Sequence, residues 1–472
     1  MPEQPSWPGL LVWVAGLGVS GSAAAAALLE AGAQVVAVDA RDDGSLDERA
    51  DALARLGAQV RLGPAAVAPA LPDGVDVVVA SPGWRPDAPL LAAAEARGVP
   101  VWSEVELAWR LRPEGAGPWL TLTGTNGKTT TVRMLVAVLG AAGHRAVAAG
   151  NVGTPLVAAV RAEPAYDVVA VELSSFQLHR TRSVRPLASA LLNVAPDHVD
   201  WHGSLAAYAA DKGRVYDGTQ RAAVHTLADP ETGRLLAAAA LAPGCARVGV
   251  TLGAPAPGQL GVVDDHLVDR AFGPDPDPVP LAAVADVRPS GPHNVANALA
   301  AAALARAYGV PADAVRAGLR GFVPDPHRIA AVGDVAGVHY VDDSKATNPH
   351  AAAASLAAFD PVVWVAGGLA KGATFDDLVR GAAGRLRAVV LLGRDRALIA
   401  EALARHAPEV PVVDVASTDT GVMAQVVRAA AAAAQPGDTV LLAPACASMD
   451  LFTDYGHRGD AFAAAVRALR DQ

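Results

Sequence analysis

The sequence predicts an α/β protein of about three domains with mostly parallel sheets. Its 472 residues correspond to about three domains of ordinary size. Apolar strand patterns alternate with alanine-rich helical patterns along most of the chain, and this alternation favours parallel strands joined by helices. Two stretches rich in proline and glycine, at residues 112–118 and 321–327, are typical of linkers and divide the chain into three series.

The elements of each series follow from these patterns. The first series predicts strands at 10–16, 34–39 and 75–83 and a helix at 20–31. The second predicts strands at 118–124, 166–175 and 186–194 and helices at 129–142 and 294–308. Within it, residues 241–290 are rich in proline and glycine, so we expect short antiparallel strands there, including a hairpin at 261–269. The third predicts strands at 338–344, 361–368, 386–393, 410–415 and 438–445.

Composition limits the class of protein. Hydrophobic residues make up 52% of the chain, but much of this is alanine, and no apolar run reaches the about 18 residues that a membrane span needs. The first residues lack the basic segment of a signal peptide, so we expect mature sequence. Cys245 and Cys446 make no disulfide framework, which indicates a reduced compartment, the cytoplasm. The net charge of −10, without a dense Lys/Arg block, argues against nucleic acid as a partner.

The first candidate site is Gly16-Leu-Gly18-Val-Ser-Gly21, between a predicted strand and a predicted helix, with Asp39 at the end of the next strand. This arrangement has the form of a dinucleotide-binding loop. Glycines let the backbone approach a pyrophosphate, and the helix N-terminus favours the anion. Taken alone, the pattern is compatible with a nicotinamide cofactor, with any nucleoside diphosphate, or with a tight turn that binds nothing.

The second candidate is the stretch Thr123 to Thr130, which reads TGTNGKTT. It is a short version of the phosphate-binding loop, with two residues between its glycines where the common motif has four. Backbone N–H groups would surround the phosphates, Lys128 would reach the β- and γ-phosphates, and the Thr129 hydroxyl would bind Mg²⁺. A bare turn is a poor alternative, because it gives no reason for Lys-Thr at the start of an apolar helix.

The third candidate is a set of polar residues that follow predicted strands: Glu172, Asn193, Asp197 and His198. Ligands of open α/β sheets bind beyond the carboxyl ends of the strands, so Glu172 and His198 could hold a metal ion near the phosphate loop. Taken alone, such residues are more often solvated loop residues or helix caps. His202, four residues after His198, is interpreted as a bystander.

Several stretches, in order along the chain, together resemble the Mur ligase family. They are TGTNGKTT, GNVGTP (150–155), VELSSFQL (171–178), LNVAPDHVD (192–200), DKGRVY (211–216), GPHNVANALAA (291–301), PHR (326–328), DDSKATN (342–348) and LLAPACASMD (441–450). The combination of VELSSFQL, DDSKATN and PACAS is most similar to the D-glutamate-adding members. The short GxxGK[ST] loop is shared with folylpolyglutamate synthases.

The resemblance implies three domains. These are a Rossmann-like UDP-binding domain at 1–112, a central P-loop ATPase domain at 119–324, and a Rossmann-like C-terminal domain at 325–472 that binds the amino acid and closes on ATP. It implies a monomer that acts on UDP-N-acetylmuramoyl-L-alanine and D-glutamate in peptidoglycan precursor synthesis. The γ-phosphoryl group of ATP would pass to the L-alanyl carboxylate, and the amine of D-glutamate would attack the resulting acyl phosphate. ADP, phosphate and an amide would result.

The resemblance also implies site residues. For ATP these are Gly124, Thr125, Asn126, Gly127, Lys128, Thr129, Thr130, Asn294, Asn297, Arg328 and Asp343, with Arg328 reaching the nucleotide only after closure. For the UDP-linked substrate they are Gly18, Val19, Ser20, Asp39, Arg41, Ser81, Gly83, Asn151 and His198. For D-glutamate they are Thr347, Lys371, Ser448 and Tyr455, the last through its backbone where phenylalanine is the expected residue. The residues with a catalytic role would be Lys128, Glu172, His198, Lys212 and Lys371.

Two Mg²⁺ ions are implied, with Thr129, Glu172, His198 and Lys212 as their ligands. Lys212 matches the position of a carbamylated lysine in the family. A carbamate converts a cation into an anion, which explains a lysine beside a metal ion. From the residue type alone, a surface lysine in a salt bridge would be favoured.

Other functions remain as alternatives. Another Mur ligase is one, and the absence of a DNPR-like stretch, which marks the diaminopimelate-adding members, argues against that member. A folylpolyglutamate synthase is another, and the loop at Gly16–Gly21 argues against it. An NAD-dependent dehydrogenase fused to an ATPase would explain that loop and Asp39 but not DDSKATN or PACAS. A regulator that only binds nucleotides would not need Lys128, Glu172, His198, Lys212 and Lys371 together.

Overall fold

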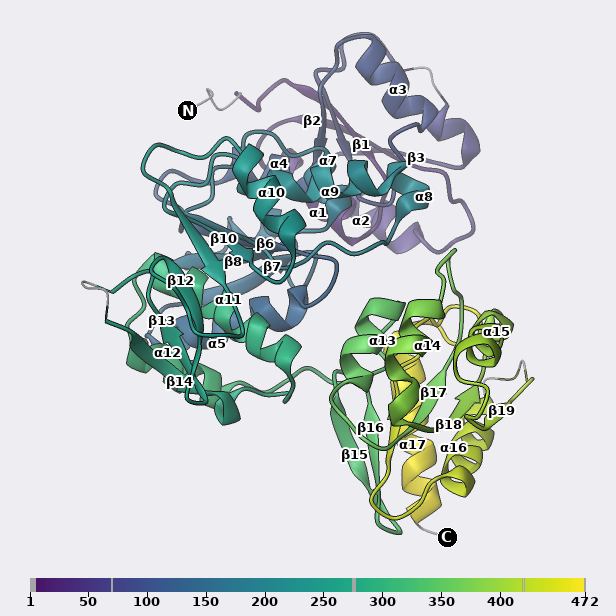
Figure 1. The fold of residues 1–472 in the computed structure, drawn as a ribbon. Coiled ribbons are helices and arrows are strands. Elements are labelled where there is room, and N and C mark those ends of the chain that lie inside the picture. Colours follow the sequence, from purple (N-terminus) through teal and green to yellow (C-terminus); the bar gives the residue numbers. More distant parts are fainter. Residues whose placement is uncertain (1–5, 69–70, 274–276, 418, 420, 471–472) are drawn as a thin grey trace. The chain divides into compact units, whose positions relative to one another are not determined.

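The computed structural model describes residues 6–68, 71–273, 277–417, 419 and 421–470 (Figure 1). The chain forms two compact units: residues 1–286 with 296–322, and residues 287–295 with 323–472. The first unit holds two β-sheets and the second holds one, so each of the three predicted series contributes one sheet. The predicted α/β class with mostly parallel strands is confirmed.

The N-terminal sheet is fully parallel, in the order β3-β2-β1-β4-β5. This order matches the first five strands of the classic doubly wound fold, whose order is 3-2-1-4-5-6. Its strands are β1 (Leu11–Ala15), β2 (Gln34–Asp39), β3 (Gln59–Leu62), β4 (Val77–Ala80) and β5 (Val101–Ser103). Successive residues of β1 pack on opposite faces: Val12 and Val14 contact α1 (Val19–Glu30) and α4 (Glu104–Leu111), and Trp13 faces α3 (Pro89–Ala96). Helix α2 (Asp47–Arg55) and the 3₁₀ turn η1 (Pro64–Val67) complete this domain.

The central sheet has the order β14-β13-β12-β11-β10-β9-β6-β8-β7. Its parallel strands are β6 (Trp119–Thr123), β7 (Ala146–Gly150), β8 (Val168–Glu172), β9 (Ala188–Leu191), β10 (Ala222–Thr226), β11 (Ala246–Val250) and β12 (Gln259–Val263). Strands β13 (His266–Asp269) and β14 (Val279–Ala283) run antiparallel at one edge. Strand β6 lies between β9 and β8, so residues that follow these three strands meet at one end of the sheet.

Several helices connect and cover the central strands. They are α5 (Lys128–Ala141), α6 (Leu156–Ala159), α7 (Ser175–His179), α8 (Val199–His202), α9 (Leu205–Gly213), α10 (Pro230–Ala238), α11 (Pro292–Tyr308) and α12 (Ala312–Gly321), with 3₁₀ turns η2 (Arg214–Tyr216) and η3 (Val284–Asp286). Helices α5 and α12 pack closely at Gly318. A Cβ at this position would lie only 2.8 Å from the backbone nitrogen of Val138. The predicted hairpin at 261–269 is confirmed as β12 and β13. The expectation of only antiparallel strands at 241–290 is wrong, since β11 and β12 pair in parallel and extend the main sheet.

The sheet of the second unit has the order β15-β16-β20-β17-β18-β19. Its strands are β15 (Ala330–Val335), β16 (Val338–Asp342), β17 (Val362–Ala366), β18 (Leu386–Leu391), β19 (Val412–Asp414) and β20 (Thr439–Leu442), and only the β15–β16 pair is antiparallel. Helices α13 (Pro349–Leu356), α14 (Asp376–Ala382) and α15 (Arg396–His406) cover one face, and α16 (Val422–Ala433) and α17 (Tyr455–Arg470) cover the other. A 3₁₀ turn, η4 (Ala383–Arg385), follows α14.

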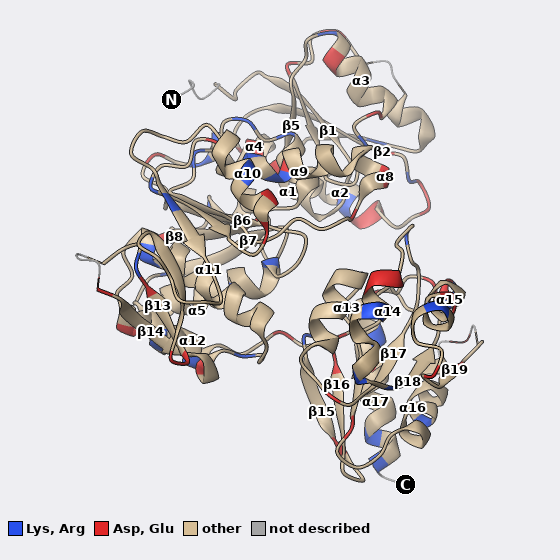
Figure 2. Cartoon of the chain, viewed as in Figure 1, with Lys and Arg blue, Asp and Glu red and all other residues tan. Residues whose placement is uncertain are grey.

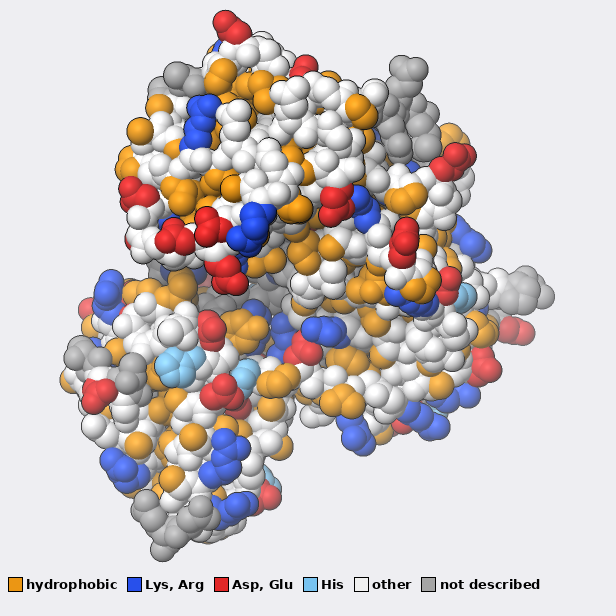
Figure 3. All heavy atoms as spheres, turned by 180° about the vertical axis from the view of Figure 1, so that it is seen from behind, with side chains coloured by type: hydrophobic (Ala, Val, Ile, Leu, Met, Phe, Trp, Pro, Cys, Tyr) orange, Lys and Arg blue, Asp and Glu red, His pale blue; other side chains and the backbone are white. Residues whose placement is uncertain are grey.

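Charged residues are spread over the described chain rather than gathered on one basic face. Lys and Arg alternate with Asp and Glu along the ribbon (Figure 2). The space-filling view of the opposite side shows both signs of charge interspersed with hydrophobic and uncharged side chains (Figure 3). Among the residues with a described position, no helix is both long enough and apolar enough to cross a membrane.

Candidate active site

The phosphate-binding loop joins the end of β6 to the start of α5, as the sequence predicts. Gly127 has a left-handed backbone (φ 83°), and a Cβ there would overlap the side-chain oxygen of Asn297, so both the conformation and the space require glycine. The Lys128 Nζ donates to the carbonyl oxygens of Gly124 at 2.9 Å and Thr125 at 2.8 Å. The lysine therefore folds back over the loop, and the first turn of α5, with Thr129 and Thr130, follows directly.

Asn193, which follows β9, holds the loop in shape. Its carbonyl oxygen accepts from the Thr125 N–H at 3.0 Å, and its side-chain oxygen accepts from the Asn126 N–H at 2.8 Å. Its amide nitrogen donates to the Asn126 carbonyl at 3.1 Å. The Thr125 hydroxyl lies 3.0 Å from the Tyr208 hydroxyl and accepts from the Ala195 N–H. The loop is thus preorganised by the segment after β9.

Glu172 ends β8 and is 1% exposed. Its Oε1 accepts from the Asn151 side chain at 2.8 Å, whereas its buried Oε2 has no hydrogen-bond donor among the described residues. Burying a carboxylate oxygen without a donor is costly. A cation that bound this oxygen would remove the cost, and the sequence placed Glu172 in the role of a Mg²⁺ ligand.

Lys212, in α9, is buried and 2% exposed, so the interpretation as a surface lysine is wrong. Its Nζ donates to the Gly124 carbonyl at 2.9 Å and lies 4.6 Å from the centre of the Tyr208 ring. Burial and the positive charge of Lys128 lower the pKa of Lys212 well below its usual 10.5, against the opposing effects of Asp197 and Glu172. The neutral amine is therefore strongly favoured relative to a solvated lysine.

His198 is the residue before α8, and His202 is the last residue of that four-residue helix. His198 has a left-handed backbone (φ 51°), and its Nε2 lies 3.5 Å from an Asp197 oxygen. The His202 side chain is 1% exposed and has two partners: Asp211 Oδ2 at 3.0 Å and the Ser175 hydroxyl at 3.0 Å. The partners of His202, which the sequence led us to interpret as a bystander, come from two other helices, α7 and α9, that no spacing in the sequence reveals.

The site fits Mg²⁺ only as an ion shared with phosphate. Over the described residues, no group of three or more His, Cys, Asp or Glu side chains is close enough to hold a metal ion. Mg²⁺ commonly takes one or two protein ligands together with substrate phosphates and water. The unpaired Glu172 oxygen next to the phosphate loop suits that arrangement.

The predicted nucleotide residues of the N-terminal domain line one pocket of about 390 Å³. Its lining consists of Gly16, Gly18, Val19, Ser20, Asp39, Arg41, Ser81, Pro82, Gly83 and Trp84. Gly16 has φ 96°, and a Cβ there would come within 2.9 Å of both the Trp84 Nε1 and the Ser81 hydroxyl oxygen, so the turn needs glycine. Trp84 is the lining residue that the sequence did not indicate.

Asp39 is engaged by the protein itself. One carboxylate oxygen accepts from the Leu17 N–H at 2.8 Å, and the two oxygens together accept from the Arg41 guanidinium at 3.0 and 2.9 Å. Burial alone would raise the pKa of Asp39, but the hydrogen bonds from Arg41 and from the Leu17 N–H outweigh it and lower the pKa to about 2. A ribose hydroxyl of a nicotinamide cofactor would have to compete with Arg41 for this carboxylate.

The second unit brings three loops together at the carboxyl ends of β16, β20 and β17, which are neighbours in its sheet. Ala445 N donates to Ala346 O at 2.9 Å, which places the segment before Thr347 beside the segment before Ser448. Leu369 and Ala447 exchange two backbone hydrogen bonds, so the loop of Lys371 lies beside the same segment. The structure therefore gathers the residues predicted for D-glutamate.

Arg458, in α17, hydrogen-bonds to two of these loops, and the sequence did not indicate this residue as part of the site. It is 1% exposed, and its guanidinium donates to the Ser344 hydroxyl at 3.0 Å, the Ser344 carbonyl at 2.8 Å and the Cys446 carbonyl at 3.1 Å. The Ser344 hydroxyl donates in turn to the Tyr455 carbonyl at 2.7 Å. An arginine in an amphipathic helix carries no signal in sequence that it is buried.

The remaining predicted nucleotide residues lie in different parts of the chain. Asn297 is buried against Gly127, and Asn294 is buried in the first turn of α11. Asp343 follows β16 in the second unit, where burial raises its pKa to about 6 despite hydrogen bonds from the Ser355 hydroxyl and the Ile329 N–H. Arg328 lies in the same unit and lowers the pKa of Asp343 by its charge.

Three family models match this chain in order. Residues 11–103 match the Mur ligase MurD-like N-terminal domain, residues 122–305 match the Mur ligase middle domain, and residues 327–446 match the Mur ligase glutamate ligase domain. The chain belongs to the Mur ligase family. The three-domain organisation predicted from the sequence is thereby confirmed.

This Mur ligase has similar curated relatives. The UDP-N-acetylmuramoylalanine–D-glutamate ligase of Streptomyces avermitilis is 61% identical over 466 residues, which cover 98% of this chain and 99% of that protein. The ligase of the same name from Thermobifida fusca is 60% identical over 466 residues, with the same coverage of both chains. These relatives span the N-terminal pocket, the phosphate loop and the gathered loops of the second unit.

Solved structures support the same fold. MurF from Acinetobacter baumannii matches with a TM-score of 0.60 and 17% identity, covering 92% of this chain and 91% of that one. The UDP-N-acetylmuramate-alanine ligase MurC from Thermotoga maritima matches with a TM-score of 0.56 and 19% identity, covering 98% and 99%. At these identities the likeness concerns the fold alone.

Proposed function

We propose that this Mur ligase joins the L-alanyl carboxylate of UDP-N-acetylmuramoyl-L-alanine to the amine of D-glutamate, with cleavage of ATP to ADP and phosphate. The observation that carries the proposal is the cluster around Gly124, where Lys128 and Lys212 converge on one carbonyl oxygen beside the buried carboxylate of Glu172. The names of relatives at 60–61% identity over nearly the whole chain support this choice of substrates.

The phosphate loop would activate the L-alanyl carboxylate of the substrate, which is a poor electrophile. Lys128 and the N-terminus of α5 would bind the β- and γ-phosphates, where their positive charge stabilises the transferring group. A carboxylate oxygen of the substrate attacks the γ-phosphorus, and the bond from that phosphorus to the β,γ-bridging oxygen breaks, which releases ADP. The amine of D-glutamate then attacks the acyl carbon, loses a proton, and expels phosphate as the C–O bond breaks.

Two anions must approach each other in the first step, so cations are required. Thr129, Glu172 and His198 are the residues that would hold Mg²⁺, which would neutralise the phosphate and carboxylate oxygens. The buried Oε2 of Glu172, which has no hydrogen-bond partner among the described residues, supports the assignment of this carboxylate as a Mg²⁺ ligand. The position of His198 in a strained backbone conformation directly after Asp197 supports a role for its ring.

We also propose that Lys212 is carbamylated in the active protein. Its neutral amine would attack carbon dioxide, form an N–C bond and release one proton, which leaves a carbamate anion. Burial and the nearby Lys128 favour this chemistry, because both disfavour a second ammonium at the site. The carbamate would supply the oxygen ligand that a lysine lacks.

The UDP-linked substrate would bind at the pocket of the N-terminal domain, and D-glutamate would bind at the loops of the second unit. The UDP group would occupy the pocket of about 390 Å³ in the N-terminal domain, with Arg41 available to a phosphate or the uracil. Asn151, which is held by Glu172, would contact the muramoyl part. D-Glutamate would bind at the loops of Thr347, Lys371 and Ser448, where the ammonium of Lys371 can pair with a carboxylate.

The direct experiment is phosphate release by the purified protein with ATP, Mg²⁺ and UDP-N-acetylmuramoyl-L-alanine. D-glutamate, L-glutamate or no amino acid is added in parallel. Release that requires both the nucleotide sugar and D-glutamate supports the proposal, and Glu172→Gln serves as the inactive control. Release with a different amino acid contradicts the acceptor, and no release under any condition contradicts the ligase function.

A further inference from the structure

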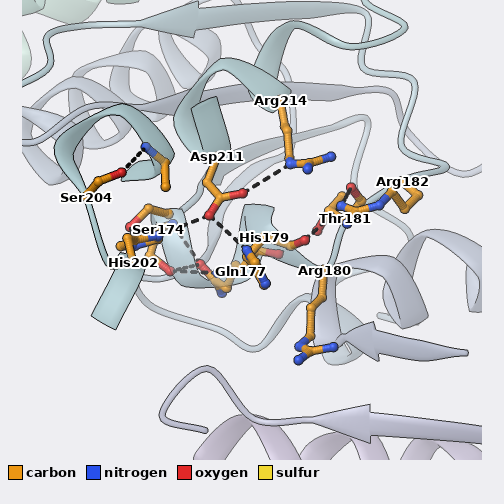
Figure 4. A network of polar contacts seen from close by, with 12 residues as sticks. Ser174, Gln177, His179, Arg180, Thr181, Arg182, His202, Ser204, Asp211 and Arg214 are labelled. Atoms are coloured by element: carbon orange, nitrogen blue, oxygen red, sulfur yellow. Dashed lines mark hydrogen bonds and ion pairs between the residues drawn. The ribbon is translucent and has the colours of Figure 1, made fainter. Parts of the chain in front are cut away.

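Asp211 is the buried centre of a polar network that lies outside the proposed catalytic contacts (Figure 4). It is 6% exposed, and its Oδ2 accepts from the His179 Nδ1 at 2.8 Å and the His202 Nδ1 at 3.0 Å. Its Oδ1 accepts from the Arg214 Nε at 3.2 Å. The His202 Nε2 continues the network to the Ser175 hydroxyl at 3.0 Å. We call these five residues the Asp211 network.

The network joins three consecutive helices of the central domain. Ser175 and His179 are the first and last residues of α7, His202 ends α8, and Asp211 lies in α9. Two of the joined helices, α8 and α9, are continuous with a residue proposed to act at the phosphate site. His198 is the residue before α8, and Lys212 follows Asp211 directly in α9.

Helix α8 needs such support, because four residues do not form a stable helix alone. His198 precedes it and Gly203 follows it, and both of these capping residues have left-handed backbones (φ 51° and 80°). The His202 ring stacks on Phe176 with an interplanar angle of 8°, and its two nitrogens bond to Asp211 and Ser175. His202 is therefore a side chain that hydrogen-bonds α8 to both neighbouring helices.

The carboxylate also fixes the form of the two imidazoles. An ionised carboxylate only accepts, so His179 and His202 both present an N–H at Nδ1. In a neutral His202 ring, Nε2 then accepts from the Ser175 hydroxyl. Ser175, His202 and Asp211 have the connectivity of a hydrolase triad, but Ser175 is 2% exposed, so no substrate can reach its hydroxyl.

We propose that Asp211 and His202 are positioning residues, which hold His198 and Lys212 at the phosphate loop for Mg²⁺-dependent phosphoryl transfer. The inference rests on the proposed function, in which those two residues bind Mg²⁺. Asp211 and His202 touch neither substrate nor metal; they act through α8 and α9. Substitution of a group that orients a metal ligand typically costs about 10- to 100-fold in metal affinity or activity.

The test compares Asp211→Asn, His202→Phe and His202→Asn with the wild type. Asp211→Asn places an amide N–H₂ against donors, and His202→Phe keeps the stacked ring but loses both hydrogen bonds. We expect each to lower kcat and to raise the half-saturating Mg²⁺ concentration by about tenfold or more, with the KM for D-glutamate changed less than about twofold. His202→Asn keeps a donor near the position of Nδ1 and should recover most of the loss.

Asp269→Asn is the matched control. Asp269 is also a buried carboxylate with an arginine partner, Arg306 at 2.8 Å, but it lies at the antiparallel edge of the sheet. This variant should lower the melting temperature and leave the Mg²⁺ dependence unchanged. A merely structural role of Asp211 predicts the same behaviour for Asp211→Asn.

Calorimetric titration of ATP at several Mg²⁺ concentrations, without the other substrates, separates this inference from the ligase function. If the wild type binds ATP but ligates nothing, the ligase function fails, and the Mg²⁺ dependence of binding still reports on positioning. Folded Asp211→Asn with wild-type kcat and wild-type Mg²⁺ dependence overturns the inference. If Asp211→Asn does not fold, the two His202 variants decide, and wild-type behaviour of His202→Phe overturns it.

Discussion

Lys128 and Lys212 donate to the same atom, the carbonyl oxygen of Gly124, each at 2.9 Å. Burial, together with the positive charge of Lys128, keeps the Lys212 amine from its usual protonated state, because a second cation beside this oxygen would be repelled. The arrangement becomes favourable when one lysine binds phosphate and the other becomes an anion. It is therefore built for a ligand that carries negative charge.

Lys128→Met should separate stability from activity. The change removes the positive charge that disfavours protonation of Lys212, so the melting temperature should stay the same or rise, while kcat should fall by about 10²- to 10³-fold because a stabilising charge at the phosphate is lost. Calorimetry and phosphate release measure the two effects. A fall in melting temperature together with an unchanged kcat would show that Lys128 is only a structural part of the loop.

Glu104 predicts a pH-dependent stability within the first unit. It is 1% exposed in α4, and Oε1 accepts from the Val157 N–H at 2.9 Å. Burial raises its pKa from 4.5 to about 7, against the hydrogen bonds from Val157 and Leu156. A raised carboxyl pKa contributes stability that is fully present below pH about 4.5 and is lost as the pH rises through about 7.

Glu104→Gln does not titrate, so its stability relative to the wild type should improve by about 2–3 kcal/mol between pH 5 and pH 8. Urea unfolding at several pH values checks this. Glu106→Gln is the control of opposite sign, because hydrogen bonds from Ser183, Arg182 and Arg110 outweigh burial and lower the pKa of Glu106. Its stability deficit should be constant over the same range. A flat difference for Glu104→Gln would refute the raised pKa.

Arg458→Lys tests the support of the D-glutamate loops. Lysine keeps the charge but cannot donate to Ser344 and Cys446 at once, so the loops lose their common tie. The KM for D-glutamate should rise by about tenfold, while the KM for the nucleotide sugar stays within about twofold. Arg387→Lys is the control, because Arg387 pairs with Asp438 at the opposite end of the sheet. Equal effects of both variants on all KM values would contradict a specific role.

Arg41→Ala tests the pocket of the N-terminal domain. The guanidinium is half exposed at the pocket and carries the charge available to a uridine diphosphate. The KM for the nucleotide sugar should rise by about tenfold, with the KM for D-glutamate unchanged. Asp43→Asn alters a neighbouring side chain that accepts from the Ser45 N–H and is not among the described residues that line the pocket, so it should change either constant much less. A raised KM for D-glutamate alone would place the nucleotide sugar elsewhere.

The sequence predicts most of this fold because the strands are short apolar runs with clear ends. Residues 361–368 predict β17 (Val362–Ala366), in which every side chain is buried between two layers of helices. The antiparallel β15 has no such run, and its ladder is interrupted near Gly333, so its pattern is weak. Boundaries also shift by one or two residues where a loop glycine ends the strand, as at Gly16.

The polar network around the site could not be predicted in the same way. Asp211 and His202 are ordinary surface types in sequence, and their pairing depends on how three short helices pack. Lys212 is buried against the usual tendency of lysine, so only the resemblance to a family drew attention to it. Polar residues after predicted strands indicate that the site lies at the carboxyl ends of those strands. The hydrogen-bond partners that lie on other helices are determined by tertiary packing, which the sequence pattern does not show.

The central claim is that the γ-phosphoryl group passes to the substrate carboxylate at the phosphate loop. The most direct test uses UDP-N-acetylmuramoyl-L-alanine labelled with ¹⁸O in the alanyl carboxylate, with ATP, Mg²⁺ and D-glutamate. We expect the released phosphate to carry one ¹⁸O atom per turnover, because the acyl C–O bond breaks when the amine attacks. Phosphate without ¹⁸O, released alongside the amide product, would contradict the acyl-phosphate route.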